Sequence, residues 1–488
     1  MRKGIKCIGL LIVLILFSGN TALADDLQTV LQDDPSCFIK EGGLPETITD
    51  EVEQLLNRKT GVKVYARSSA SGLTFEEYLV NQLEQLEERI DVESYNLSKE
   101  DIYNVYAAVL NKHPELYYVN TRVTYSYYQT TGIIKTLTVS YADYDREAVE
   151  AELNKTLKLV KEDMSDLEKI IFIHDYLCVD VEYAYQDYLD DTLGPDVHNL
   201  KGAVLDKCAV CDGYSSAFQY YMVQLGIPCN IVINNDHAWN QVCLDGAWYM
   251  VDVTFDDPIW DNYGFVRHSY LLNSQNKLLQ DRTWEVEDYE ICTKTTYDNA
   301  FWSDVNAQMI CHDSTWFFID SDKNLYQHDF RKDAIGEKGK WITELGGVWY
   351  QYGGTAYYTG NQIKLASGYG LLFFSQPDGI YQCEFDGTGK REVVAADTTN
   401  GYVYGMKLNG NQIDYQIAKA PMEEERENLS FRLDSLMNIN EAEVMLSSDS
   451  FIYNGLEQYP IVEVSYAGDL LMQNQDYVLE YNYPQRGT

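Results

Sequence analysis

Two neighbouring stretches of the sequence decide how its central region folds: CDGYSSAFQYYMVQLG, residues 211–226, and HAWNQVCLDGAWYMVD, residues 237–252. The first repeats apolar residues at the three- and four-residue spacing of a buried helix, and Gly226 and Pro228 end it. The second has Asp245-Gly246 between two apolar runs, which is typical of a two-residue hairpin loop. The sequence therefore predicts a buried helix followed by an antiparallel hairpin.

These two elements bring together residue types that suit nucleophilic catalysis. Cys211 lies in or just before the first turn of the helix, where backbone N–H groups and the helix dipole favour a thiolate and could hold an oxyanion. A two-residue loop pairs Leu244 with Ala247, and the same register makes His237 and Asp252 diagonal neighbours on one sheet face. Such Cα atoms lie roughly 7–8 Å apart. An imidazole leaning toward that carboxylate could act as a general base.

The motifs of this region resemble the transglutaminase-like superfamily, over about residues 167–273. They occur in the order CDGYS (211–215), LGIP (225–228), HAWN (237–240) and DGAWYMVDVTFDD (245–257). The resemblance implies a papain-like α+β core in which Cys211 is the nucleophile, His237 the general base and acid, and Asp252 the residue that orients the histidine. Residues 70–165 also resemble the segment that often precedes the domain in secreted bacterial members.

The resemblance implies acyl transfer on amides, as hydrolysis, crosslinking or deamidation. His237 would take the thiol proton, and the thiolate would attack an amide carbonyl to give an acyl-thioester, which water or a lysine amine then resolves. We predict a cysteine-dependent enzyme acting on a protein or peptide substrate, foremost a peptidase. The alternatives are a transglutaminase or deamidase, and a non-enzymatic surface adhesion or scaffold protein whose core only binds. No cofactor and no metal is predicted.

Cys208 and Cys211 also form a CxxC pair, which leaves other interpretations open. The pair could be a redox couple, an inactivating disulfide or half of a zinc site that needs two further ligands, and Cys211 could be a plain core cysteine. A redox couple does not require His237 or Asp252, so acyl transfer is the preferred hypothesis.

Several other residues of this region are interpreted as structural. Ser165 to Glu168 forms a capping box for a helix whose apolar face includes His174, so we predict a core histidine with satisfied hydrogen bonds. The cysteines and large aromatic residues of the predicted strands are expected to lie in the core, with a disulfide left open for the cysteines. These are Cys229, Cys243, Trp239, Trp248 and Tyr249.

The N-terminus predicts secretion. Basic residues precede an apolar run of ten residues, 8–17, and Ala22-Leu23-Ala24 then forms a cleavage site, which together are typical of a signal peptide over residues 1–24. We therefore expect an extracellular protein, secreted or at the cell surface. Removing Cys7 from the ten cysteines leaves nine, and an odd number implies a free thiol or an intermolecular partner.

Charge excludes one class of partner. The chain has 37 Lys+Arg against 76 Asp+Glu, a net charge of −39, and so acidic a surface repels nucleic acid. No later segment reaches the ~20 apolar residues of a membrane span.

The fold class that we predict is α+β, with β-rich modules after the core. Residues 316–330 match residues 371–385, 371 − 316 = 55 positions later, as two strands around a polar turn. This pattern is typical of propeller blades, but two units cannot close a ring, so a small repeat sheet packed on its neighbour is expected. Residues 421–432 are interpreted as a polar linker. The C-terminal residues resemble bacterial Ig-like surface repeats that could contact a cell-surface polymer or protein.

The resulting domain organisation has five parts. It comprises a signal peptide at residues 1–24, a mixed α/β domain at 25–160, the transglutaminase-like core at 161–290, a β-rich repeat domain at 296–420 and an incomplete Ig-like module at 433–488. Within the α/β domain, a capping box at Thr74 predicts a helix to about residue 89, and Ser98 is expected to cap a second helix that ends near residue 113. Strands are predicted at 116–128 and 133–141.

Overall fold

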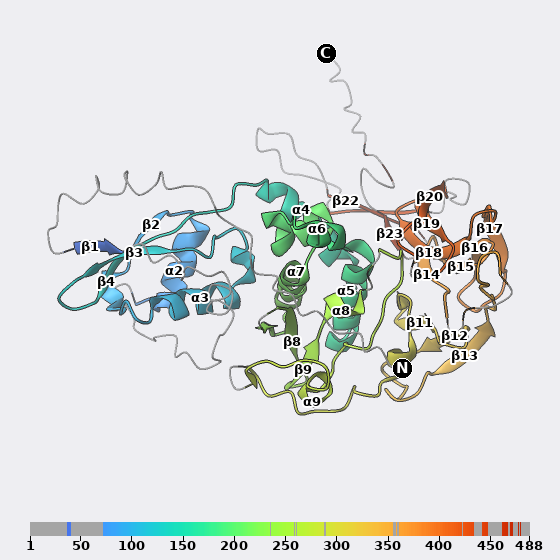
Figure 1. The fold of residues 1–488 in the computed structure, drawn as a ribbon, viewed down its shortest axis with the longest axis horizontal. Helices are drawn as coiled ribbons and strands as arrows, with labels where there is room; N and C mark the ends of the chain where they lie inside the picture. Colours follow the sequence, from blue (N-terminus) through green and yellow to red (C-terminus); the bar gives the residue numbers. More distant parts are fainter. Residues whose placement is uncertain are drawn as a thin grey trace, which may run out of the picture. The chain divides into compact units, whose positions relative to one another are not determined.

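The structure is a computed structural model, and Figure 1 labels its helices and strands. The chain divides into two compact units. The first lies within residues 1–152, 184–254 and 272–298, and the second within residues 153–183, 255–271 and 299–488. The predicted signal peptide and most of the predicted Ig-like module fall outside the described residues. Those residues are 37–40, 72–234, 236–257, 259, 261–286, 289–354, 358, 361–421, 423–433, 442–447, 461–466, 469–471, 477 and 479.

The N-terminal part of the first unit packs helices on an antiparallel sheet of order β1-β3-β4-β2. The capping box at Thr74 is confirmed, because the Glu77 amide donates to the Thr74 hydroxyl at 3.2 Å and the Thr74 amide donates to the Glu77 carboxylate at 2.8 Å. The elements are β1 (Cys37–Lys40), α2 (Phe75–Glu84), β2 (Arg89–Asp91), α3 (Ile102–Lys112), β3 (Thr124–Tyr128), β4 (Ile134–Thr138) and α4 (Arg146–Leu159), the last of which continues into the second unit.

Several boundaries differ from the prediction. The helix expected to reach about residue 89 ends at Glu84, and the strand expected at 133–141 covers Ile134–Thr138. Ser98 does not cap α3, because its hydroxyl donates to the Asp101 carboxylate at 2.9 Å and the helix begins after Asp101. The strand expected from residue 116 begins at Thr124, since residues 114–116 form a 3₁₀ turn.

The rest of the first unit holds the buried helix α7 (Cys211–Gln224) against a sheet of order β7-β8-β9. Leu244 pairs with Ala247, which confirms the predicted register, and Asp245 and Gly246 have φ angles of 51° and 75°. Two residues with positive φ match the right-handed twist of a hairpin. The other elements are α6 (Tyr185–Asp190), β6 (Cys208–Ala209), β7 (Cys229–Ile233), β8 (Ala238–Leu244), β9 (Ala247–Val251) and α9 (Gln275–Leu278).

The first helix that lies wholly within the second unit is α5 (Asp166–Asp180), and its capping box at Ser165 is also confirmed. Glu168 of that box is buried, and its second carboxylate oxygen accepts a hydrogen bond from the Trp316 indole at 2.9 Å. Two short elements, β5 (Glu182–Tyr183) and α8 (Val253–Asp256), lie where the chain passes between the units.

The predicted repeat is present, but each copy is a four-stranded antiparallel sheet rather than two strands. The matching residues form the central pair of each sheet, β11-β12 and β15-β16, and one further strand flanks the pair on each side. The first copy comprises β10 (Ile310–His312), β11 (Thr315–Ile319), β12 (Asn324–His328) and β13 (Lys340–Glu344). The second comprises β14 (Leu365–Gly368), β15 (Leu371–Gln376), β16 (Gly379–Cys383) and β17 (Arg391–Ala395). The two copies share a core with β18, so packing of one copy on its neighbour is confirmed.

A third sheet corrects the predicted linker. Residues 427–432 form β20, which pairs with β19 from Ile417 to Gln412, so the linker prediction was wrong there. Leu429 and Phe431 pack against a buried cluster, and the preceding acidic run hid this alternation in the sequence. The strands are β18 (Tyr402–Asn409), β19 (Gln412–Ala418) and β20 (Glu427–Arg432), followed by a small sheet of β21 (Glu443–Leu446), β22 (Val462–Tyr466) and β23 (Asp469–Leu471).

The structure therefore has the mixed helix and strand content that the sequence predicts, with many β-sheets. The papain-like arrangement of the core and the Ig-like character of the last module stay predictions. Across the described ranges, no helix is both long and apolar enough to cross a membrane.

The two capping boxes allow a matched test of stability. Ser165→Ala and Thr74→Ala each remove one cap and should cost about 1 kcal/mol. The loss should be larger for Ser165, because that box holds the buried Glu168. In differential scanning calorimetry, each variant should lower the melting transition of its own unit, and the other variant serves as its control. Equal shifts of both transitions in both variants would contradict the division into units.

Candidate active site

Cys211 is the first residue of α7, and the backbone before it is extended. Its side chain is 9% exposed and packs among Ile231, Ile233 and Ala238 of the neighbouring strands. The helix start approaches another segment closely, because a Cβ added at Gly213 would lie 2.6 Å from the carbonyl oxygen of residue 197. The thiol therefore sits at the positive end of the helix dipole, as the sequence predicts.

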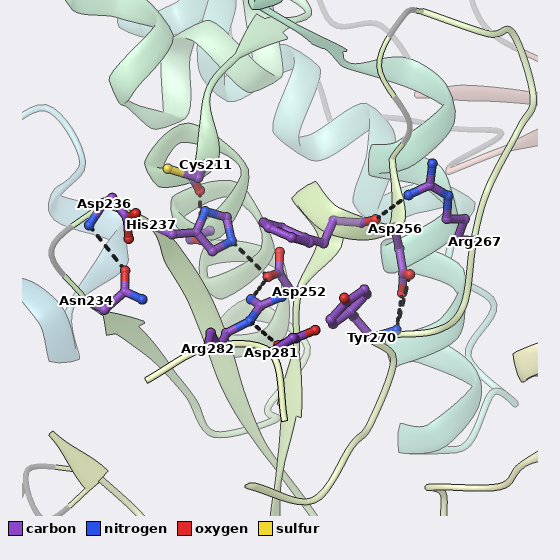
Figure 2. A network of polar contacts seen from close by, with 12 residues as sticks. Cys211, Asn234, Asp236, His237, Asp252, Asp256, Arg267, Tyr270, Asp281 and Arg282 are labelled. Atoms are coloured by element: carbon purple, nitrogen blue, oxygen red, sulfur yellow. Dashed lines mark hydrogen bonds and ion pairs between the residues drawn. The ribbon is translucent and has the colours of Figure 1, made fainter. Parts of the chain in front are cut away.

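His237 lies just before β8, and its ring lies between Cys211 and Asp252 (Figure 2). The ring Nε2 is 2.8 Å from Oδ2 of Asp252. The Cys211 side chain lies close enough to the ring to help raise its pKa. One face of the ring stacks on Trp239, with centroids 5.8 Å apart and planes at 20°. The structure thus brings the three predicted residues together.

The electrostatics of these contacts favour a protonated imidazole. Burial alone would lower the pKa of His237, but the charge and hydrogen bond of Asp252, followed by those of Cys211, raise it to about 10. Burial would likewise raise the pKa of Asp252, yet His237 and then Arg282 hold that pKa below its ordinary value. At neutral pH, His237 can therefore donate Nε2–H to an ionised Asp252.

Arg282 is the residue of this site that the sequence analysis missed. Its Nη1 donates to Oδ2 of Asp252, the same oxygen that His237 contacts, and its Nε donates to Asp281 at 3.1 Å (Figure 2). Arg282 lies 30 residues after Asp252 and belongs to no motif, so no pattern in the sequence pointed to it.

The residues interpreted as structural mostly pack as expected. Trp239 is 1% exposed and also contacts Trp284 edge to face, so it is a packing residue, as predicted. Tyr249 is buried and Trp248 is half-buried. Cys229 and Cys243 are unbridged thiols, the first buried and the second half-buried.

A second group of titratable residues lies buried in the other unit. His174 contacts Asp175 through Nδ1 at 2.8 Å and Asp256 through Nε2 at 3.2 Å, which confirms a core histidine with satisfied hydrogen bonds. His268 contacts Asp175 through Nε2 at 2.9 Å and the carbonyl of Val305 through Nδ1 at 3.0 Å. Every nitrogen of the two rings therefore has an oxygen atom within hydrogen-bond distance.

Three residues of this network could together hold a metal ion, and they form such a group within the described part of the chain. One donor atom each from His174, Asp175 and His268 lies within 4.8 Å of the others, and this donor set would suit zinc. However, a metal would have to displace the hydrogen bonds that already join these rings to the Asp175 carboxylate. The geometry therefore favours a hydrogen-bonded network over a metal centre.

The network predicts a pH dependence of stability. Burial alone would lower the pKa of His174, but hydrogen bonds and charges of Asp175 and Asp256 raise it from 6.5 to about 9. A raised folded-state pKa gives stabilisation that is complete below pH ~6.5 and is lost as the pH rises through ~9.

The thermal transition of the second unit should therefore fall over this range. His174→Gln should lower that transition throughout and remove most of the decline. His113→Gln, a histidine bound to Glu115 in the first unit, should leave the decline intact. An unchanged decline in His174→Gln would contradict this account.

Comparisons with known proteins agree with the central part of this description. Residues 154–253 match the model of the transglutaminase-like superfamily. Kyphoscoliosis peptidase of Mus musculus is 27% identical over 140 residues, which cover 25% of this chain and 20% of that protein. The chain thus spans about a fifth of the length of this curated relative.

Two solved structures also match. One is described as a TGase, with 16% identity over 25% of this chain and 41% of that chain, and a TM-score of 0.21. The other is the computationally designed Ika4 protein, with 11% identity over 42% of this chain and 89% of that chain, and a TM-score of 0.17. From the family match, the chain contains a transglutaminase-like superfamily domain at residues 154–253, and this segment includes Cys211, His237 and Asp252.

Proposed function

We propose that this protein is a secreted, cysteine-dependent acyl-transfer enzyme that hydrolyses amide bonds of a protein or peptide substrate. Cys211 is the nucleophile, His237 the general base and acid, and Asp252 orients the imidazole. One observation carries the proposal, namely that the His237 ring lies between Cys211 and Asp252, with Nε2 2.8 Å from the Asp252 carboxylate (Figure 2). A nucleophile, a base and an orienting acid in mutual contact are the arrangement that such chemistry requires.

The mechanism follows from the charge of each group. His237 takes the proton of Cys211 as the reaction begins, and because the pKa of His237 is raised to about 10, the imidazolium holds that proton. The thiolate attacks the amide carbonyl, and the positive end of α7 supports the developing oxyanion. His237 then gives its proton to the leaving nitrogen as the acyl-thioester forms. The neutral imidazole takes a proton from water, which attacks the thioester and releases the acid.

Hydrolysis is preferred over crosslinking because the curated relative that matches this region is named a peptidase. The acceptor decides between the two reactions, since water gives hydrolysis and a lysine amine gives an isopeptide bond. The segment at residues 1–24 supports action outside the cell, and the C-terminal β modules would hold the enzyme at a surface polymer or protein.

The reactive cysteine can be tested without a substrate. At neutral pH, iodoacetamide should modify Cys211 first, because burial raises the pKa of Cys311 and Cys383 to about 11. His237→Ala should slow that modification about tenfold or more by removing the positive charge beside the thiol. Peptide mass spectrometry follows the rate at each site.

His113→Ala is the matched control, because it removes another histidine of the same unit that contacts carboxylates. It should leave the Cys211 rate unchanged. A Cys211 no more reactive than an unactivated thiol would instead support the binding-only scaffold.

The reaction itself can be assigned from products. The full chain, incubated with a mixture of denatured proteins, should create new N-termini that mass spectrometry detects, and Cys211→Ser should create none. Asp252→Asn should lower the rate by about 10²-fold or more, because the imidazole loses its orienting anion. If a dansylated amine is instead incorporated at glutamine residues and no peptide bond is cut, the enzyme is a transglutaminase.

A further inference from the structure

We propose that Arg282 is a positioning residue of this site, which acts on His237 through the carboxylate of Asp252 and keeps that carboxylate ionised throughout the reaction cycle. This inference rests on the proposed function, since it assigns a role within the same reaction. Two observations support it. The segment that carries Arg282 is hydrogen-bonded to β9, and Arg282 and His237 both contact the buried Oδ2 atom of Asp252.

The segment before Arg282 is fixed to the hairpin. Asn273 and Met250 exchange two backbone hydrogen bonds, each 2.8 Å long, which tie this segment to β9 two residues before Asp252. Ser274 then caps α9, and its amide and hydroxyl both donate to the Asp298 carboxylate at 2.7 Å. This short helix therefore sets the path of the chain that brings Arg282 to the site.

The ion pair between Arg282 and Asp252 is buried. Asp252 is fully buried and the Arg282 side chain is 7% exposed, so the ion pair is little screened by water. The guanidinium carbon also lies 5.3 Å from the centre of the Trp239 ring, the same ring on which His237 stacks. The cation, the indole and the imidazole thus form one packed group around the carboxylate.

Because Arg282 and His237 contact the same oxygen of Asp252, Arg282 can affect how His237 works during catalysis. His237 is positive before the leaving group departs but neutral after it protonates the leaving nitrogen, and a buried carboxylate is costly unless it is paired with a charge. Arg282 stays positive at every step, so it keeps Asp252 anionic when the imidazole is neutral. It also competes with His237 for the same oxygen atom, which limits how firmly the imidazole holds its proton.

A double-mutant cycle separates this role from a merely structural one. Arg282→Gln should slow the release of new N-termini from denatured proteins about tenfold, because Asp252 then lacks a cation when the imidazole is neutral. In an Asp252→Asn background, the same change should alter the rate by less than about twofold, because Arg282 acts through Asp252. Arg282→Lys, which keeps the charge, should restore the rate to within about threefold of wild type. Equal losses in both backgrounds would overturn the proposal.

A second readout needs no reactive thiol. Since Arg282 and His237 share Oδ2, Arg282→Gln should strengthen the remaining bond, and the Nε2–H proton of His237 should move downfield in the NMR spectrum at pH 7. Arg282→Lys should leave the signal near its wild-type position, and this variant decides the question if Arg282→Gln does not fold. An unmoved signal in a folded Arg282→Gln variant would refute the inference.

The control is Arg331→Gln, which removes an exposed arginine that also contacts a carboxylate, that of Asp163 at 3.4 Å. It should change neither readout. The two proposals fail in different ways. If wild-type protein cuts no amide bond while the His237 signal responds to Arg282→Gln, the proposed hydrolysis is wrong and the coupling stands.

Discussion

The candidate site depends on a single buried carboxylate. Asp252 is fully buried, and a charged group without water is stable only where cations and hydrogen-bond donors surround it. His237 and Arg282 meet this requirement at the same oxygen. The carboxylate therefore fixes the imidazole in place, and the imidazole in turn faces the thiol. A structure that merely buried Asp252 without these partners would leave its charge uncompensated and His237 without an orienting partner.

Three local features of the chain converge on this carboxylate. The N-terminus of α7 presents Cys211, the hairpin places His237 and Asp252 beside each other, and the segment tied to β9 brings in Arg282. Each feature is stable for its own reason: an amphipathic helix buries one face, a two-residue loop fixes register, and a capped turn fixes direction. The chemistry thus requires backbone geometry that packing and hydrogen bonds already supply.

The second unit also buries carboxylates, and histidines contact them there as His237 contacts Asp252. Its core holds two histidines and two aspartates, which are joined by hydrogen bonds between nitrogen and oxygen atoms. Buried ionic groups of this kind are costly singly and become tolerable only as a complete set. Beside them, the two four-stranded sheets show how a sequence repeat becomes a repeated structure with a shared core.

The sequence by itself determined those features that depend on residues close together in the chain. The periodicity of residues 211–226, the capping boxes and the Asp245-Gly246 loop each predicted an element or a register that the structure contains. His237 and Asp252 could be related in advance because both lie on that one hairpin. Local geometry carries such information, since helix and hairpin contacts join residues only a few positions apart or paired across one turn.

Only the tertiary structure decided what distant segments bring to these elements. Arg282 reaches Asp252 from 30 residues away, and His268 reaches Asp175 from 93 residues away. The sequence did not predict β20, because the acidic residues before it are typical of a linker and its pairing partner, β19, lies outside that segment. Such contacts depend on where the chain returns after a loop, and no periodicity or motif in a single sequence encodes that path.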